Sequence, residues 1–167
     1  MKRWIIGVTI IITAIPVAWY LISPIWRVQE LEEVSPLEQV PISAQPEEAK
    51  QQQVQKTDSI ASSLPAVIAR GAFVSQAHGV SGSALLIEQD DARILRFENF
   101  ETVNGPDLHI YLSTDTSAKD FVDLGVIRAT KGNVNYPVAS DIDIKKYNTV
   151  LIWCVPFRIL FSSAQLQ

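Results

Sequence analysis

Two kinds of hydrophobic pattern divide the chain. Residues 4–26 form one uninterrupted apolar run, whereas from residue 67 onward short apolar runs recur between turn residues. In the run 108–112 apolar and polar positions alternate, which places Leu108, Ile110 and Leu112 on one face of a strand and His109 and Tyr111 on the other. Short, regularly spaced runs of this kind predict an all-β domain over residues 67–167.

We expect about eight strands in this domain, arranged as an antiparallel β-sandwich or barrel. Asp90 and Asp91 should form the tight turn between the second strand and the third. The nearest candidate for a helix is a single turn over residues 140–147, which Ser140 could cap. The predicted strands are 69–75, 82–89, 93–100, 108–113, 121–128, 135–138, 149–155 and 158–163.

The N-terminal apolar run is long enough to cross a membrane. Residues 4–26 contain no charged side chain, and a helix of that length spans roughly 33 Å. Lys2 and Arg3 before the run, against Arg27 after it, favour a cytoplasmic N-terminus. A cleaved signal peptide is the alternative, but its apolar region is shorter and ends in small residues, unlike Trp19 and Tyr20.

We therefore predict a transmembrane anchor over residues 1–27, with residues 4–26 in the bilayer of the plasma membrane and the rest of the chain extracytoplasmic. Residues 28–66 contain no aromatic residue and no glycine, but four prolines and seven glutamines. Such a segment buries too little apolar surface to offset the entropy lost on ordering. We expect it to be a flexible tether between the anchor and the β domain.

The charge and the missing motifs restrict the function. A net charge of −4 without a basic patch gives no reason to expect nucleic-acid binding. The chain has no Gly-x-Ser-x-Gly, His-Glu-x-x-His or Cys-x-x-Cys motif and no phosphate-binding glycine loop. Two histidines and one cysteine leave few ways to assemble a catalytic triad. We therefore do not expect a stand-alone enzyme.

Cys154 is the residue of the β domain whose chemistry stands out. It is the only cysteine, so an intramolecular disulfide is excluded. It shares strand parity with Val150 and Ile152, and free cysteines are often small buried hydrophobes. Pro156, however, marks a strand end or edge, where a thiol can be reached. At this stage Cys154 is either a reactive thiol or a packing residue.

Metal ligation is a further interpretation of the same residues. His78 lies in a glycine-flanked loop, and together with His109 and Cys154 it would match the His₂Cys set of a blue-copper site. The usual axial methionine is missing, because Met1 is the only methionine. We keep His78 and Cys154 as the candidate metal ligands. Asp107 belongs to a turn signal, Asn104-Gly-Pro-Asp, for which a structural loop is the first interpretation and a ligand role the second.

The succession of motifs after residue 67 resembles the DM thirteen domain, a small extracellular β module that also occurs in membrane-anchored prokaryotic proteins. The resemblance implies a role in electron transfer, in which the cysteine that matches Cys154 acts as a bare thiol or binds a cofactor such as haem. The residues that carry it include Gly71-Ala-Phe73, His78-Gly-Val-Ser-Gly82, Phe97-Glu-Asn-Phe100, Asn104-Gly-Pro-Asp-Leu108, Leu124-Gly125, Lys131-Gly132, Tyr136 and Trp153-Cys154.

Two functions follow as hypotheses. The first is a membrane-anchored electron-transfer accessory that meets a redox partner protein, with Cys154 as the redox thiol or as the ligand of haem or a transition metal. The alternative is a non-catalytic adhesion or ligand-binding module in which Cys154 is structural. The surroundings of the sulfur distinguish them: solvent and a nearby His78 would favour chemistry, and an apolar shell would favour packing.

Overall fold

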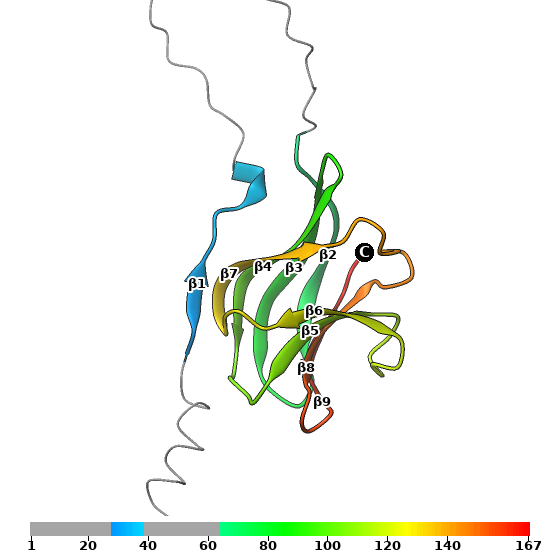
Figure 1. The fold of residues 1–167 in the computed structure, drawn as a ribbon. Coiled ribbons are helices and arrows are strands. Elements are labelled where there is room, and N and C mark those ends of the chain that lie inside the picture. Colours follow the sequence, from blue (N-terminus) through cyan, green and yellow to red (C-terminus); the bar gives the residue numbers. More distant parts are fainter. Residues whose placement is uncertain (1–27, 39–63) are drawn as a thin grey trace, which may run out of the picture.

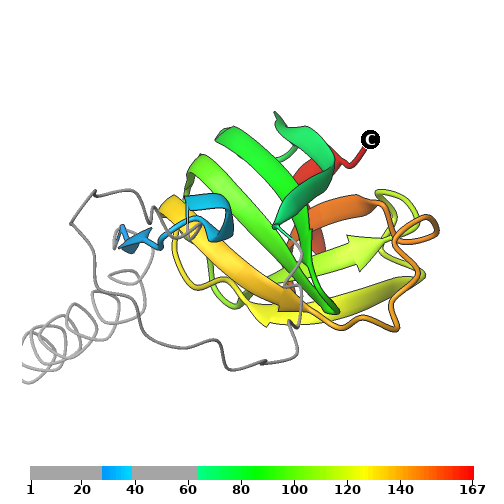
Figure 2. The ribbon, with the colours of Figure 1, turned by 90° about the horizontal axis from the view of Figure 1, so that it is seen from above.

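The computed structural model describes residues 28–38 and 64–167. Within these ranges nine strands form one sheet in the order β1-β7-β4-β3-β2-β9-β8-β5-β6. The sheet curls around its own interior into a half-barrel, as the two views in Figures 1 and 2 show. The predicted all-β class is confirmed, and the curled single sheet is nearer to an open barrel than to a two-layer sandwich.

Strands β2 to β9 correspond to the eight predicted strands, and their pairings with one another are all antiparallel. Asp90 takes the left-handed conformation, with φ at 51°, in the turn expected between β3 and β4. The elements are β1 (Glu30–Glu32), a 3-10 turn η2 (Pro36–Glu38), β2 (Ala66–Ser75), β3 (Val80–Gln89), β4 (Ala92–Thr102), β5 (Leu108–Ser113), β6 (Phe121–Val126), β7 (Lys131–Val138), β8 (Thr149–Cys154) and β9 (Ile159–Gln165).

The helical turn expected over residues 140–147 is not a helix but a succession of turns. Asp143, and not Ser140, organises it. The Asp143 carboxylate accepts hydrogen bonds from the backbone N–H groups of Lys145, at 3.0 Å, and Lys146, at 3.3 Å. These are the contacts of an N-cap residue, so Asp143 caps one short turn that does not continue into a helix.

The curl of the sheet depends on β2, which pairs with β3 along its first part and with β9 along Phe73–Ser75. At the crossing between the two partners, a Cβ atom on Gly71 would collide with the backbone carbonyl of Gln165. Glycine therefore permits the close approach of the two backbones. Next to it, Arg70 and Gln167 exchange two backbone hydrogen bonds of 3.0 Å each.

Apolar side chains from β2 through β9 fill the half-barrel. The rings of Phe73 and Phe97 meet edge to face with centroids 4.9 Å apart, and Phe100 packs against both. Leu108, Ile110 and Leu112 all point into this core, as their alternation with His109 and Tyr111 predicted. The hydrophobic pattern of β5 thus places its other face, with His109 and Tyr111, on the outside of the sheet.

Tyr136 makes the stability of this core sensitive to alkaline pH. Its ring is buried, and its hydroxyl oxygen accepts a hydrogen bond of 3.1 Å from the backbone N–H of Arg128. Burial raises the pKa of Tyr136 to about 12. An unfolded tyrosine ionises near pH 10, so the free energy of unfolding should fall by about 2 to 3 kcal/mol between pH 10 and pH 12.

Urea unfolding of the wild type and of Tyr136→Phe, at pH 8 and at pH 11.5, measures this effect. Tyr136→Phe is less stable at pH 8, because Arg128 loses its acceptor, but its stability should decline less as the pH rises. Equal declines in the two proteins would show that Tyr136 does not titrate in this window.

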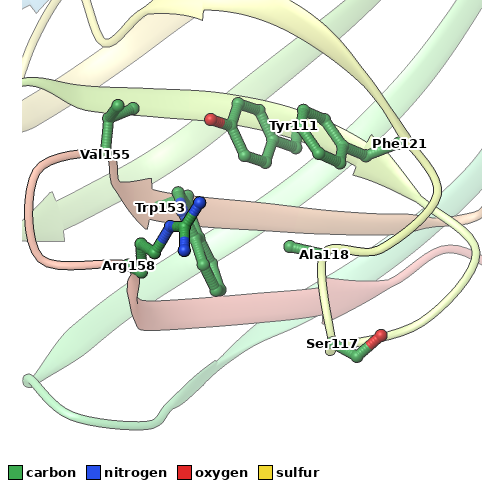
Figure 3. Close-up of a pocket in the computed structure, with 7 residues that line it drawn as sticks. All are labelled: Tyr111, Ser117, Ala118, Phe121, Trp153, Val155 and Arg158. Atoms are coloured by element: carbon green, nitrogen blue, oxygen red, sulfur yellow. The ribbon is translucent and has the colours of Figure 1, made fainter.

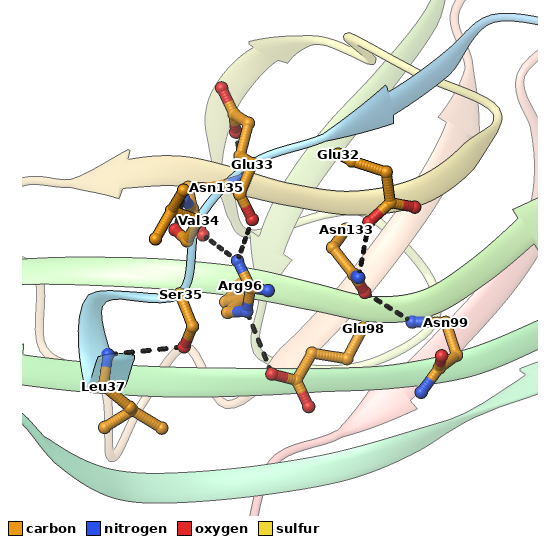
Figure 4. A network of polar contacts seen from close by, with 10 residues as sticks. All are labelled: Glu32, Glu33, Val34, Ser35, Leu37, Arg96, Glu98, Asn99, Asn133 and Asn135. Carbon is orange, nitrogen blue, oxygen red and sulfur yellow. Dashed lines mark hydrogen bonds and ion pairs between the residues drawn. The ribbon is translucent and has the colours of Figure 1, made fainter. Parts of the chain in front are cut away.

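Residues 28–38 add an edge strand to the sheet. Strand β1 pairs parallel with β7, so that Leu31 lies opposite Gly132. Figure 4 shows the polar network that holds the segment in place around Arg96. The buried Arg96 guanidinium donates to the backbone oxygen of Glu33 at 3.0 Å, to Asn135 Oδ1 at 2.9 Å and to the Glu98 carboxylate at 2.9 Å.

This docked segment differs from the expectation of a tether that begins at residue 28. In the sequence, the few apolar residues of this segment do not predict packing. In the structure, backbone pairing and charged hydrogen bonds hold the segment. The Glu33 carboxylate, for example, accepts from the Asn135 backbone N–H at 2.6 Å and pairs with the Arg128 guanidinium at 2.6 Å. The predicted anchor, 1–27, and tether residues 39–63 lie outside the described residues. No helix in the described ranges has the length and hydrophobicity needed to span a membrane.

Candidate functional site

Cys154 lies at the end of β8 with its side chain in the core. It stands opposite Leu108 of β5 and Ile159 of β9, and none of its surface is exposed. Val150 and Ile152 point into the same interior, so the predicted strand parity is confirmed. The Cys154 sulfur lies 3.2 Å from the carbonyl oxygen of Pro106, to which the thiol donates a hydrogen bond. The sulfur is therefore shielded from solvent, and its one donor is used.

The loop between β4 and β5 covers this end of the core. Pro106 and Asp107 are exposed. Gly105 lies against the ring of Phe161, so close that a Cβ atom on Gly105 would lie 2.9 Å from the nearest ring carbon. The Asn104 side chain accepts a hydrogen bond of 2.9 Å from the backbone N–H of Gly105. The turn signal and the cysteine, which the sequence presents separately, thus form one unit in which the loop covers the thiol.

His78 and the Cys154 thiol contact different residues. It is exposed, and its ring packs on Phe161 with the centroids 4.1 Å apart, whereas Cys154 contacts Pro106. Among the described residues no group of three or more histidine, cysteine, aspartate or glutamate side chains is arranged to hold a metal ion. The surroundings of Cys154 do not fit haem or a metal as they stand, because the loop would first have to leave the sulfur.

His109 is engaged by two carboxylates on the outer face of the sheet. Its Nδ1 lies 2.8 Å from Asp123 Oδ2, and its Nε2 lies 3.2 Å from Asp107 Oδ1. Both ring nitrogens are therefore directed at acidic partners, which opposes a role for His109 in a His₂Cys metal site. Asp107, whose ligand role was the second interpretation, acts as a partner of this imidazole.

An aromatic pocket lies beside His109 on the same outer face, built from β5, β6 and β8 (Figure 3). The rings of Tyr111 and Phe121 are stacked, with centroids 4.0 Å apart and an interplanar angle of 17°. The Trp153 ring lies 6.2 Å from that of Tyr111 at an angle of 28°. The pocket encloses about 480 Å³, a volume within the range of sites for small organic molecules.

Two connecting segments complete the pocket. Ser117 and Ala118 come from the loop between β5 and β6, and Val155 and Arg158 come from the turn between β8 and β9. Ala118 and Arg158 both hold left-handed backbone conformations, with φ of 50° and 52°. Such conformations are unfavourable for residues other than glycine and concentrate at functional sites.

The loop wall of the pocket is held in a fixed shape by Asp120. Its backbone oxygen accepts hydrogen bonds from the N–H of Thr114, at 3.1 Å, and from the Ser113 hydroxyl, at 3.2 Å. Its carboxylate accepts from the Tyr147 hydroxyl and pairs with Lys146, each at 2.9 Å. The hydrogen bond from Lys146, followed by that from Tyr147, lowers the pKa of Asp120, so the carboxylate stays ionised at neutral pH.

The polar end of the pocket is set by Tyr111. Burial, followed by the nearby charges of Asp123 and Asp107, raises the pKa of Tyr111. The phenol is therefore neutral at physiological pH. The pocket accordingly presents flat apolar rings, one neutral hydroxyl and the guanidinium of Arg158.

Part of this pocket was open to prediction. Strand parity alone indicated that Tyr111 lies on the face opposite Leu108 and that Trp153 lies on the face opposite Cys154. What the sequence did not reveal is that β5 and β8 are neighbours, with His109 opposite Trp153. Phe121 and Arg158, from a third strand and a turn, carried no motif that would have joined them to the other two.

Comparison with known proteins identifies a family. The model of the family described as electron transfer DM13 matches residues 72–166. The matched range includes Cys154, the covering loop and every residue that lines the pocket, and it leaves out β1 and the N-terminal run. No curated protein and no solved structure matches the chain.

Proposed function

Because the chain belongs to the DM13 electron-transfer family, we propose that it is an accessory protein of electron transfer whose aromatic pocket receives the redox group of an electron carrier. The proposal places the β domain on the extracytoplasmic side of the plasma membrane, anchored through residues 4–26. The observation that carries the proposal is the pocket of Tyr111, Phe121 and Trp153.

The surroundings of Cys154 support a packing role for this residue. A thiol reacts as its thiolate, in positions that are partly exposed and near positive charge. Cys154 is instead fully buried among apolar side chains, and its hydrogen atom is donated to a carbonyl oxygen. The redox group is therefore better sought outside the core.

The pocket has the features that a site for an organic carrier requires. Aromatic rings provide a large apolar contact area with little side-chain entropy to lose, and a few polar groups fix the orientation of the ligand. Trp153 directly precedes Cys154 in the chain but points to the outer face, so the pocket is reached from solvent without opening the core.

The alternative function is a ligand-binding module that takes no part in electron transfer. The burial of Cys154 favours it, since this hypothesis requires the cysteine only to pack. The two functions differ in one measurable property: the proposed electron-transfer site binds the oxidised and the reduced ligand with different affinities, and a simple binding module need not.

The probe for this difference is anthraquinone-2-sulfonate, which takes up two electrons and two protons to become the hydroquinone. Its midpoint potential is measured with the full-length chain in nanodiscs of zwitterionic lipid and with empty nanodiscs. A tenfold preference of the protein for one redox state shifts the potential by about 30 mV. We expect a shift of at least this size with the wild type and with Cys154→Ala, and its loss in Trp153→Leu.

An unchanged potential in the presence of bound probe would favour the binding module. A shift that disappears in a folded Cys154→Ala variant, while Trp153→Leu keeps it, would return the redox role to the cysteine. Far-ultraviolet circular dichroism and the unfolding midpoint of each variant show whether the half-barrel remains intact.

A further inference from the structure

We infer that the aromatic pocket selects planar aromatic anions and that Arg158 recognises their negative group. The inference rests on the proposed function for the choice of this site as the functional one. It adds the chemical class of the ligand, and binding of such a ligand does not by itself require electron exchange.

The shape of the ligand follows from the orientation of the rings. The ring planes of Phe121 and Trp153 lie at 17° and 28° to that of Tyr111, so each is stacked with Tyr111 and not edge-on to it. Phe121 also keeps 39% of its surface exposed. A flat ring can stack on such walls. A compact ammonium ion prefers rings that surround it from several sides, as in an aromatic cage.

The charge of the ligand follows from Arg158. Among the described residues, Arg158 is the one charged residue that lines the pocket, and none of the others accepts a hydrogen bond from its guanidinium. The acidic residues around this face have other partners: Asp107 and Asp123 contact His109, and Asp120 contacts Lys146. A negative group at the mouth of the pocket would therefore meet a cation that has no carboxylate competing for it.

The geometry of a guanidinium narrows the negative group further. Its planar set of N–H donors matches the two oxygens of a carboxylate or sulfonate. The left-handed backbone of Arg158 in the turn after β8 brings this fork beside Trp153 (Figure 3). A ligand with its ring on the aromatic wall and a carboxylate or sulfonate at its edge fits both features.

The test uses 2-naphthoate, a planar aromatic carboxylate that is not a redox carrier. Isothermal titration calorimetry is performed with the full-length chain in zwitterionic nanodiscs, and the heat measured with empty nanodiscs is subtracted. We expect saturable binding of one molecule per chain. The neutral 2-naphthamide and the cationic 2-naphthylmethylammonium should bind at least about tenfold more weakly, because neither makes a charge-assisted pair with a guanidinium.

Three variants connect the binding to Arg158. Arg158→Gln should weaken 2-naphthoate about tenfold and leave 2-naphthamide unchanged, while Arg158→Lys should retain part of the preference for the anion. Arg70→Gln is the matched control, since Arg70 is also an exposed arginine but lies on β2, away from the pocket. The affinity of Arg70→Gln for 2-naphthoate should equal that of the wild type.

Equal affinity of the wild type and Arg158→Gln for 2-naphthoate would overturn the inference, as would equal binding of the three naphthalene probes. Selective binding of 2-naphthoate without any shift in the anthraquinone potential would support the ligand class and remove the electron-transfer role. A shift in the anthraquinone potential that persists in Arg158→Gln would support the electron-transfer role and remove the ligand class.

Discussion

The native full-length protein is expected to react with iodoacetamide at Cys154 at least about a thousandfold more slowly than the urea-unfolded chain. The sulfur has no exposed surface and donates its hydrogen to Pro106 O beneath the loop 103–107. Alkylation must then wait for an opening of the structure, which in a stable domain is populated at about one part in a thousand or less. Mass spectrometry of quenched samples gives both rates.

A second variant controls for the reactivity of the reagent. In Cys154→Ala combined with Ser140→Cys, the only thiol lies at an exposed position, and the native and unfolded rates should be similar. Rapid alkylation of native wild type would instead mean that the covering loop opens readily. That result would support a redox role for Cys154 in addition to that of the pocket.

Gly132→Ala is expected to detach β1 from the sheet, whereas Gly125→Ala should not. Both glycines have positive φ, 114° for Gly132 and 102° for Gly125, so both substitutions carry a backbone penalty of about 1 to 2 kcal/mol. A Cβ on Gly132 would also collide with the carbonyl oxygen of Leu31, while a Cβ on Gly125 meets nothing within 4 Å. The comparison separates the loss of β1 docking from the conformational penalty.

Amide hydrogen exchange reports the docking directly. The Glu33 N–H donates to the Asn133 carbonyl oxygen at 2.8 Å, so its exchange should be slowed in the wild type and in Gly125→Ala. In Gly132→Ala the Glu33 amide should exchange at close to the rate of an unprotected peptide, while amides of β3 stay protected. Protection of Glu33 in all three proteins would show that β7 shifts to accept the methyl group.

The strands after residue 67 could be predicted because their signals are local. Apolar alternation in β5 specifies which side chains face inward, and the structure agrees for Leu108 and Ile110. The uninterrupted apolar run of β8 specifies only that Cys154 shares a face with Val150 and Ile152. Turn residues such as Asp90 separate the runs. The sequence left Cys154 open as a reactive thiol or a packing residue, and it did not show that Pro106 would cover the sulfur.

The pocket and the docking of β1 depend on which strands become neighbours in the sheet. The hydrophobic pattern of a single sequence does not show these neighbours. The pocket exists because β5 lies between β6 and β8, which brings Phe121 and Trp153 to either side of Tyr111. Strand β1 forms because Arg96 and Asn135, distant in sequence, present partners to Glu33. Its polar composition predicted a tether, since charged hydrogen bonds leave no hydrophobic periodicity.

Under the proposed membrane anchor, the docking of β1 limits how far the domain can travel from the bilayer. If residues 4–26 cross the membrane, only Arg27 separates them from the segment held on β7, so the half-barrel sits at the lipid surface. Residues 39–63 then connect η2 to β2 within one domain and add nothing to that distance. With β1 released, the connection from residue 27 to β2 would instead include every residue from 28 to 65. Docked β1 would thereby keep the pocket at the membrane, and released β1 would allow the pocket to meet a partner farther out.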